Sequence, residues 1–196
     1  MKKLLLIALL VLGTNFAKAQ EDKTSISAGY TSVKLKIKLD IPDHDVSETE
    51  SMNATGFFIG LMREIQINSK YSFKPGVIYT NLSSDEGNND DKIEYIQIPF
   101  LFNYYPNEKV FLSAGPKVDY LIEDQTEDGF HKISLALGLG IGFELSKKLD
   151  IIANYSIQLS DSLGDEYDDN LSSDANTDIN TSLKQNFFNI GLAYNF

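Results

Sequence analysis

The sequence predicts an all-β fold, namely an eight-stranded antiparallel up-and-down transmembrane β-barrel that follows a cleaved signal peptide. Three observations support this prediction. The first residues have the organisation of an export signal, and the rest of the chain alternates apolar and polar residues with a period of two. The connections between the alternating segments are short and long in strict succession, as in barrels that cross a membrane.

The N-terminus carries the export signal. Two lysines, Lys2 and Lys3, precede an apolar run from Leu4 to Leu12, and the small residues Ala17 and Ala19 stand before a polar segment. This run is about half of the roughly 20 residues that a membrane-spanning helix needs. We therefore expect residues 1–19 to be a signal peptide and residues 20–196 to form one barrel domain.

Composition excludes several functional classes. The chain of 196 residues has no cysteine, which rules out disulfides, thiolate metal sites and thiol catalysis. Its net charge of −11 argues against nucleic acid as a partner, because that affinity depends on Lys and Arg that neutralise phosphates. No phosphate-binding glycine loop precedes a helical segment, so we expect no cofactor.

The clearest strand covers residues 132–146. Its apolar residues are Ile133, Leu135, Leu137, Leu139, Ile141, Phe143 and Leu145, and the intervening positions are small or polar and include three glycines. The outer face of a soluble sandwich would instead carry Lys, Thr and Glu. Small residues facing a narrow lumen and large apolar residues facing lipid are typical of a barrel.

Seven further segments show the same alternation, at residues 25–39, 57–65, 71–79, 96–104, 112–122, 151–160 and 188–196. The first of them changes phase between Tyr30 and Val33, which a β-bulge or an extension into an extracellular ribbon would explain.

The connections define two ends of the barrel. Tight turns are expected at residues 68–70, 106–108 and 146–148, and long connections at residues 40–53, 83–92, 124–130 and 161–184. Most of the 28 acidic residues lie in or beside the long connections. Short turns face the periplasm in outer-membrane barrels, so the extracellular loops are expected to be anionic.

A block of residues on the fourth predicted strand resembles a known family. The segment from Tyr95 to Phe102, the following Tyr104-Tyr105-Pro106, the segment from Leu112 to Pro116 and the aromatic last strand are similar to the PorT-like outer-membrane β-barrel family. This resemblance implies an eight-stranded barrel in the outer membrane without implying one activity. The alternating C-terminal residues Ile190, Leu192, Tyr194 and Phe196 also resemble the aromatic-ended signal that the barrel assembly machinery recognises.

Inward side chains must oppose inward side chains across a hairpin, so the turns predict which residues meet. The predicted pairs are Glu64 with Lys74, Gln97 with Lys117, Tyr95 with Asp119, and Glu144 with Ile152. In the last hairpin we prefer Ser146 opposite Asp150, because the alternative sets Glu144 against Asp150 and like charges directly opposite are destabilising.

These side chains predict a polar lumen network made of Glu64, Lys74, Tyr95, Gln97, Lys117, Asp119 and Glu144. The network is either a selective polar path or a salt-bridge network that fills the core. Eight strands leave an interior only just wide enough for side chains, which favours the filled core.

Catalytic and metal sites are weakly indicated. Alternation places His131 and Ser134 on opposite faces, so they cannot act together, and we expect no enzyme activity. The acidic loop residues Asp165, Glu166, Asp168 and Asp169 are weak candidates for a calcium or magnesium site, because runs of charge are usually solvated loops.

The sequence thus favours a multi-pass outer-membrane barrel with a structural or surface-interaction role, whose partners are outer-membrane lipid, the barrel assembly machinery and an unidentified protein. The alternatives are an accessory component of an outer-membrane transport or secretion system and an exported soluble β-barrel that binds a ligand.

Overall fold

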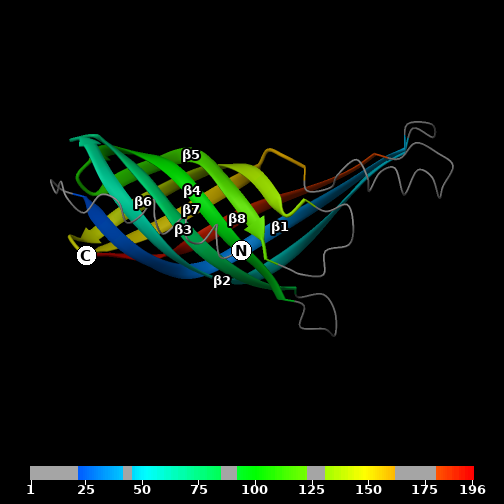
Figure 1. Ribbon diagram of the computed structural model, residues 1–196, viewed down its shortest axis with the longest axis horizontal. Helices are drawn as coiled ribbons and strands as arrows, with labels where there is room; N and C mark the ends of the chain where they lie inside the picture. Colours follow the sequence, from blue (N-terminus) through cyan, green and yellow to red (C-terminus); the bar gives the residue numbers. More distant parts are fainter. Residues whose placement is uncertain (1–21, 42–45, 85–91, 123–130, 162–179) are drawn as a thin grey trace.

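The computed structural model describes residues 22–41, 46–84, 92–122, 131–161 and 180–196, which form a closed barrel (Figure 1). The eight strands are β1 (Lys23–Ile41), β2 (Val46–Asn68), β3 (Tyr71–Ser84), β4 (Lys92–Asn107), β5 (Val110–Leu121), β6 (Ile133–Ser146), β7 (Leu149–Gln158) and β8 (Asn180–Asn195).

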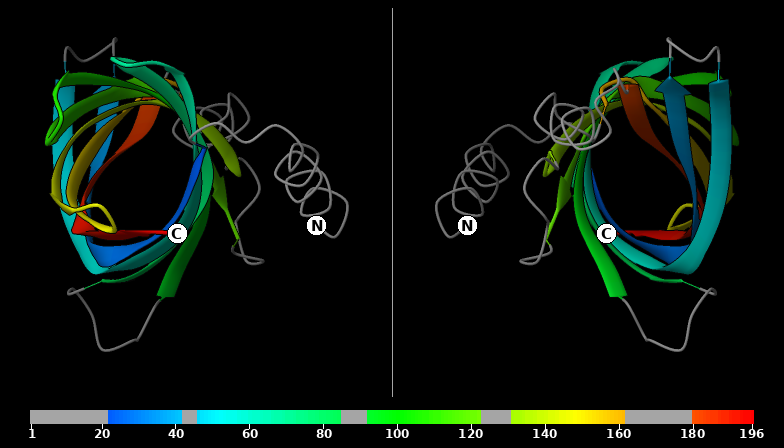
Figure 2. Two further views of the ribbon diagram at one scale, coloured as in Figure 1. Left: turned by 90° about the vertical axis from the view of Figure 1, so that its left-hand side faces the viewer. Right: turned by 90° about the vertical axis from the view of Figure 1, so that its right-hand side faces the viewer.

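Each strand pairs antiparallel with its neighbours in the sequence, and β8 closes the ring on β1. Figure 2 shows the ring from both ends. The predicted fold class, an eight-stranded antiparallel up-and-down barrel, is confirmed. No helix in the described part of the chain is long and apolar enough to cross a membrane.

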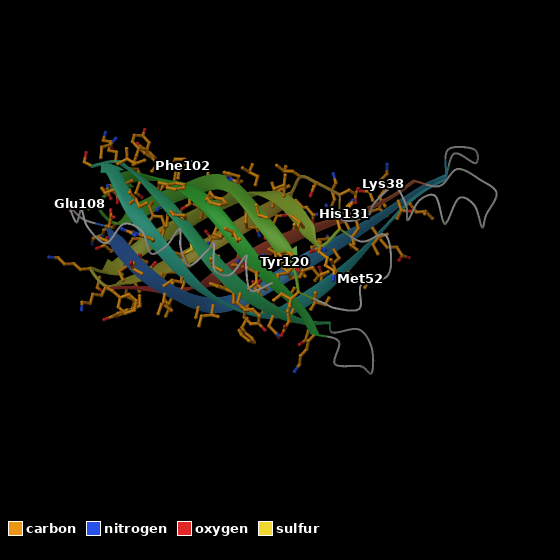
Figure 3. The ribbon with its side chains drawn as sticks, viewed as in Figure 1. Lys38, Met52, Phe102, Glu108, Tyr120 and His131 are labelled. Atoms are coloured by element: carbon orange, nitrogen blue, oxygen red, sulfur yellow. The ribbon has the colours of Figure 1, made fainter. Side chains whose placement is uncertain are left out.

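A belt of large apolar side chains covers the outside of the barrel. On β6, for example, Ile133, Leu135 and Ile141 are exposed while Ser134 and Ala136 are buried. The same alternation runs along the other strands, and Phe102 projects outward from β4 (Figure 3). In water so extended an apolar surface would be unfavourable, whereas hydrocarbon solvates it. The soluble ligand-binding alternative is therefore inconsistent with the structure.

Strand β1 is regular throughout, so the predicted bulge after Tyr30 is absent. Its pairings with β2 and β8 run without a register shift. The large apolar residues change face instead. Tyr30 points outward toward lipid, whereas Val33 points into the lumen, and this produces the change of phase in the sequence. The extension into a ribbon was the correct alternative: β1, β2 and β8 continue past the other strands (Figure 1). Much of the loop expected at residues 40–53 is therefore strand.

The hairpin between β4 and β5 corrects two predicted pairs. The Oδ1 atom of Asn107 accepts hydrogen bonds from the backbone N–H groups of Lys109 (2.9 Å) and Val110 (3.0 Å). This cap fixes the turn at residues 108–109 rather than 106–108. The resulting register sets Gln97 opposite Asp119, Pro99 opposite Lys117 and Tyr95 opposite Leu121. The predicted pairs Gln97 with Lys117 and Tyr95 with Asp119 were wrong, although all four side chains keep their inward direction.

The hairpin between β6 and β7 also differs from its prediction. Glu144 lies opposite Asp150, and Ser146 lies opposite Leu149. The two acids tolerate each other because Asn195 Nδ2 donates a hydrogen bond to Asp150 Oδ2 (3.0 Å) and Glu144 is only half-buried at the mouth of the barrel. For comparison, two unit charges about 4 Å apart in bulk water repel by only about 1 kcal/mol.

Candidate functional site: the barrel interior

The first layer of polar contacts lies near the turn end of the barrel. Lys74 Nζ is 3.8 Å from Glu64 Oε2, and both side chains are buried. The other carboxylate oxygen of Glu64 accepts hydrogen bonds from Ser72 Oγ (2.6 Å) and from the hydroxyl of Tyr105. Lys74 Nζ also lies 5.1 Å from the centre of the Phe111 ring. The turns of the two hairpins thus bring together a carboxylate from β2, an ammonium group from β3 and a phenol from β4.

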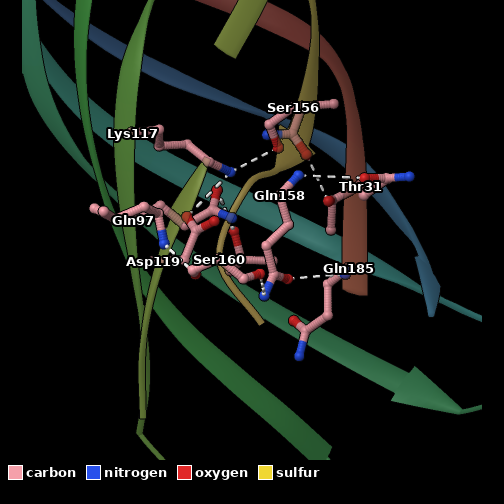
Figure 4. Close-up of polar contacts among 12 residues, drawn as sticks. Thr31, Gln97, Lys117, Asp119, Ser156, Gln158, Ser160 and Gln185 are labelled. Atoms are coloured by element: carbon pink, nitrogen blue, oxygen red, sulfur yellow. Dashed lines mark hydrogen bonds and ion pairs between the residues drawn. The ribbon is translucent and has the colours of Figure 1, made fainter. Parts of the chain in front are cut away.

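A second layer crosses the middle of the barrel (Figure 4). Lys117 Nζ is 3.0 Å from Asp119 Oδ1, donates a hydrogen bond to Ser156 Oγ (2.8 Å) and lies 4.6 Å from the centre of the Phe187 ring. Asp119 is only 3% exposed and Lys117 only 5%. The two charges therefore have protein groups rather than bulk water around them, and each depends on the other.

Between these layers the lumen narrows to a cavity of about 60 Å³. Gln97 lines this cavity, and Asn103 lies beside its lining residue Ser113; both side chains are almost completely buried. Within the described residues, Gln97 Nε2 and Asn103 Nδ2 have no hydrogen-bond partner. The wall of this cavity is mainly apolar and includes Phe58, Phe111 and Phe187. The cavity is too small for an organic ligand, since ligand pockets are typically about 300 Å³ or more.

An apolar cluster closes the lumen on the side of the long connections. Its buried members are Val33, Ala54, Leu82, Tyr95 and Phe187, with Leu35, Ile93 and Leu121 packed against them. The ring of Tyr95 meets that of Phe187 edge to face, with 5.2 Å between the centroids. Side chains from strands β1 to β5 and β8 thus converge on the axis and exclude water from it.

The wider mouth at the turn end is open. A depression of about 710 Å³ is lined there by Glu64, Glu144, Asp150, Lys23 and Lys70, among others. Carboxylates and amines share its wall, and none of the described residues forms a group of three acids or histidines able to hold a metal ion. Glu64 lines this mouth at its inner side, where its carboxylate pairs with Lys74.

The structure separates the sequence-predicted lumen residues into three environments. Glu64 with Lys74 and Lys117 with Asp119 form two ionic layers, Tyr95 belongs to the apolar cluster, and Glu144 lies at the mouth. Gln97 accepts a long hydrogen bond from Thr80 (3.4 Å). Sequence reasoning missed Ser72, Tyr105, Ser156 and Phe187. Inward alternation was the available signal for Ser156, but only the curved sheet shows that Ser156 on β7 reaches Lys117 on β5 past the intervening strand β6.

The rejected catalytic pair behaves as alternation predicts, because His131 is exposed and Ser134 is buried. Figure 3 shows His131 on the outside of the barrel. The metal candidates Asp165, Glu166, Asp168 and Asp169 lie outside the described residues, so their arrangement stays a prediction.

A closed ring with an apolar outer belt and a filled polar core defines a small barrel of the outer membrane. The model of the outer membrane protein β-barrel domain family matches residues 4–196, and the chain belongs to this family. The family and the lipid-facing belt place the protein in the outer membrane as a multi-pass β-barrel.

Solved structures share this fold at low sequence identity. Neisserial surface protein A (NspA) is 12% identical with a TM-score of 0.53, and the match covers 90% of this chain and 100% of NspA. Ail, the attachment invasion locus protein of Yersinia pestis, is 19% identical with a TM-score of 0.48 and the same coverage. OprG from Pseudomonas aeruginosa is 14% identical with a TM-score of 0.49, covering 90% of this chain and 97% of OprG. No curated protein sequence matches the chain.

Proposed function

We propose that this protein is a non-enzymatic outer-membrane barrel with a closed lumen, whose role is structural or lies in contacts made at the cell surface. The observation that supports this proposal best is the filling of the interior. Two ionic layers and an apolar cluster follow one another along the axis, and the space left between them is about 60 Å³.

The energetics of these layers argue against a gated pore. Opening the axis would separate Lys117 from Asp119 and expose the apolar cluster to water. Removing one partner of a buried ion pair typically destabilises a protein by about 3–5 kcal/mol. The plug therefore contributes to the stability of the barrel, and movement of solute through it would require partial unfolding.

The features available for interaction lie at the opposite end from the turns. There β1, β2 and β8 extend beyond the other strands and connect to the acidic segments of the sequence. A rigid barrel that holds a projecting ribbon and charged loops is suited to contact with other molecules at the surface.

Conductance tests the closed lumen. The refolded protein should give no stable current steps in planar bilayers, because no continuous aqueous path crosses the interior. A trimeric porin reconstituted in the same bilayers serves as the positive control. Steady porin-sized steps from the wild-type protein would contradict the closed lumen and would favour a transport role.

The second candidate is an accessory component of an outer-membrane transport or secretion system. It is favoured by the block from Tyr95 to Phe102, which resembles the PorT-like family. Native membranes solubilised in mild detergent test this candidate. Stoichiometric co-purification of secretion components would support it, whereas isolation of the barrel alone at native expression levels would support the surface role.

A further inference from the structure

The outer faces of β1, β2 and β8 change character along their length. Toward the turn end they are apolar, and the last large residues of this part are Tyr30, Phe57 and Phe188. Tyr30 is paired with Phe57, and Phe188 is paired with Ser32, so the three rings lie at neighbouring levels of the barrel. Aromatic girdles of this kind mark the interface between lipid and water.

Beyond this girdle the same outward face becomes cationic. We define the lysine face as the outward side chains of residues 32–38, 49–55 and 182–186. Its lysines are Lys34, Lys36, Lys38 and Lys184, all of which are exposed. Its other members are small and polar, namely Ser32, Thr49, Ser51, Asn53, Thr55, Ser182 and Asn186. Not one of these outward positions carries a carboxylate, although the chain has a net charge of −11.

The register concentrates the positive charge. Lys36 lies directly opposite Lys184, and Lys34 and Lys38 flank Lys36 on the same side of β1. Like charges directly opposite are destabilising in a sheet. Among the described residues, Lys34, Lys36 and Lys184 form no ion pair. The neighbouring carboxylate Glu50 pairs with Ile37 and therefore projects from the other face of the ribbon. An anion bound between the lysines would relieve this repulsion.

The height of the lysine face matches the lipid headgroups. Lys34 is four residues beyond Tyr30, which corresponds to about 13 Å along a strand and about 10 Å along the membrane normal at the usual tilt. The polar layer on each side of the hydrocarbon core is about 5–8 Å thick. The Cα atom of Lys34 therefore lies slightly beyond the polar layer. Its long apolar stem allows the ammonium group to reach back to the headgroups. Figure 3 shows Lys38 farther out on the projecting ribbon.

We propose that the lysine face of β1, β2 and β8 binds the phosphorylated headgroups of outer-leaflet lipid. Lys34 contacts the headgroup phosphates nearest the hydrocarbon core, and Lys36 with Lys184 clamps an anionic group above them. The hydroxyl and amide side chains of Ser51, Asn53 and Asn186 donate hydrogen bonds to the same headgroup. Lipid is favoured over a soluble anion because the lysine face continues directly from the lipid-facing belt, which brings the acyl chains and the headgroup of one molecule into contact with adjoining surfaces.

The test compares lipid binding by matched charge variants. Native mass spectrometry of the refolded barrel in neutral detergent measures binding of phosphorylated lipid A and of the same lipid after its phosphates are removed. The variant K34Q/K36Q/K184Q removes three charges from the lysine face. The control K70Q/K109Q/K147Q removes three exposed charges at the turn end and has the same net charge. A third variant, K36R/K184R, retains the cations. Heat-modifiable migration on gels verifies that each variant is folded.

The wild-type protein should bind the phosphorylated lipid in preference to the dephosphorylated lipid. A lysine near an anionic surface contributes about fivefold in affinity, so the triple glutamine variant should lose on the order of a hundredfold. The turn-end control and the arginine variant should bind nearly as the wild type does. Equal losses in the two glutamine variants, or equal binding of both lipids, would overturn the proposal. Equally tight binding of a phosphorylated glucosamine disaccharide without acyl chains would show that the face recognises soluble anions and would also overturn it.

Discussion

Buried charges with defined partners dominate the residue-scale energetics of the lumen. Lys117 is held by Asp119, by Ser156 and by the face of the Phe187 ring. Glu64 is held by Lys74, Ser72 and Tyr105. In each case hydrogen bonds supplement the opposite charge, which is the condition under which a buried ion pair is tolerated.

Replacing Lys117 by Met should destabilise the barrel by about 3–5 kcal/mol, because Asp119 would remain buried without its cation. The double variant K117M/D119N should recover much of this loss, since neither charge then remains. Urea unfolding in lipid vesicles, followed by heat-modifiable migration on gels, measures both effects. The exposed-site control K109M should change stability by less than about 0.5 kcal/mol. Equal stability of K117M and wild type would show that the pair is not part of the core.

Tyr105 should stabilise the layer near the turn end through its hydroxyl group. Tyr105→Phe removes a hydrogen bond to the Glu64 carboxylate and should cost about 1.5–3 kcal/mol in the same unfolding assay. The adjacent Tyr104 provides the control, because its side chain is exposed on the lipid-facing side of β4. Tyr104→Phe should therefore leave stability nearly unchanged. A loss shared equally by both variants would contradict the assigned role of the Tyr105 hydroxyl.

At the scale of elements, caps and closure determine how the strands are joined. Asn68 and Asn107 hold equivalent positions in two turns, and the Oδ1 atom of each accepts hydrogen bonds from two backbone N–H groups that follow it. The last strand closes the ring, where Phe196 N–H donates to the carbonyl oxygen of Thr24 (2.9 Å) and Asn195 N–H donates to that of Lys148 (2.9 Å).

Deletion of residues 194–196 should abolish folding of the barrel. The deletion removes the contacts that join β8 to β1 and β7 near the turn end, and open strand edges are not tolerated in a membrane. It also removes part of the predicted assembly signal formed by Ile190, Leu192, Tyr194 and Phe196. Loss of heat-modifiable migration in cells and in vitro would follow from the missing contacts. Loss of heat-modifiable migration in cells alone would assign the effect to recognition by the assembly machinery. Normal migration in cells and in vitro would contradict the roles assigned to the strand contacts and to the assembly signal.

At the scale of the whole molecule, the two ionic layers and the apolar cluster are successive barriers along the barrel axis. We therefore predict that removing any one of them leaves the lumen closed. The double variant Y95A/F187A removes the two largest rings of the apolar cluster, but the pair of Glu64 and Lys74 still closes the turn end. It should remain non-conducting in planar bilayers while losing stability, since each truncation of a buried aromatic residue costs about 3–5 kcal/mol. Stable current steps from this variant would show that the ionic layers do not block the lumen.

Cleavage of the signal peptide during export determines the N-terminal residue of the mature protein. If residues 1–19 are a signal peptide, mass spectrometry of the protein from outer-membrane fractions should find Gln20 at the N-terminus. Replacing Ala19 by a bulky residue such as Tyr should slow this cleavage, because signal peptidase requires small residues there. The conservative change Ala19→Gly is the control. An intact Met1 in the membrane fraction would contradict the prediction.

The sequence by itself determined the number of strands, the face of the sheet to which each inward residue belongs, and the two ends of the barrel. Alternation with a period of two is a local property, and it correctly placed Lys117 and Asp119 inside and Ile133 outside. The length of β2 was underestimated, because the polar residues 46–53 pair with β1 and their strand has no lipid-facing pattern.

The predicted pair of Glu64 with Lys74 was correct, but in the other two hairpins only the tertiary structure decided which inward residues meet. Register across a hairpin depends on the turn, and a side-chain cap at Asn107 shifted Gln97 from Lys117 to Asp119. Contacts between strands that are not neighbours, such as that of Lys117 on β5 with Ser156 on β7, depend on the curvature of the sheet and leave no trace in the local pattern. The lysine face depended on the local sequence pattern and on the tertiary structure. Alternation directs Lys36 and Lys184 outward, but only the pairing of β1 with β8 sets them opposite each other.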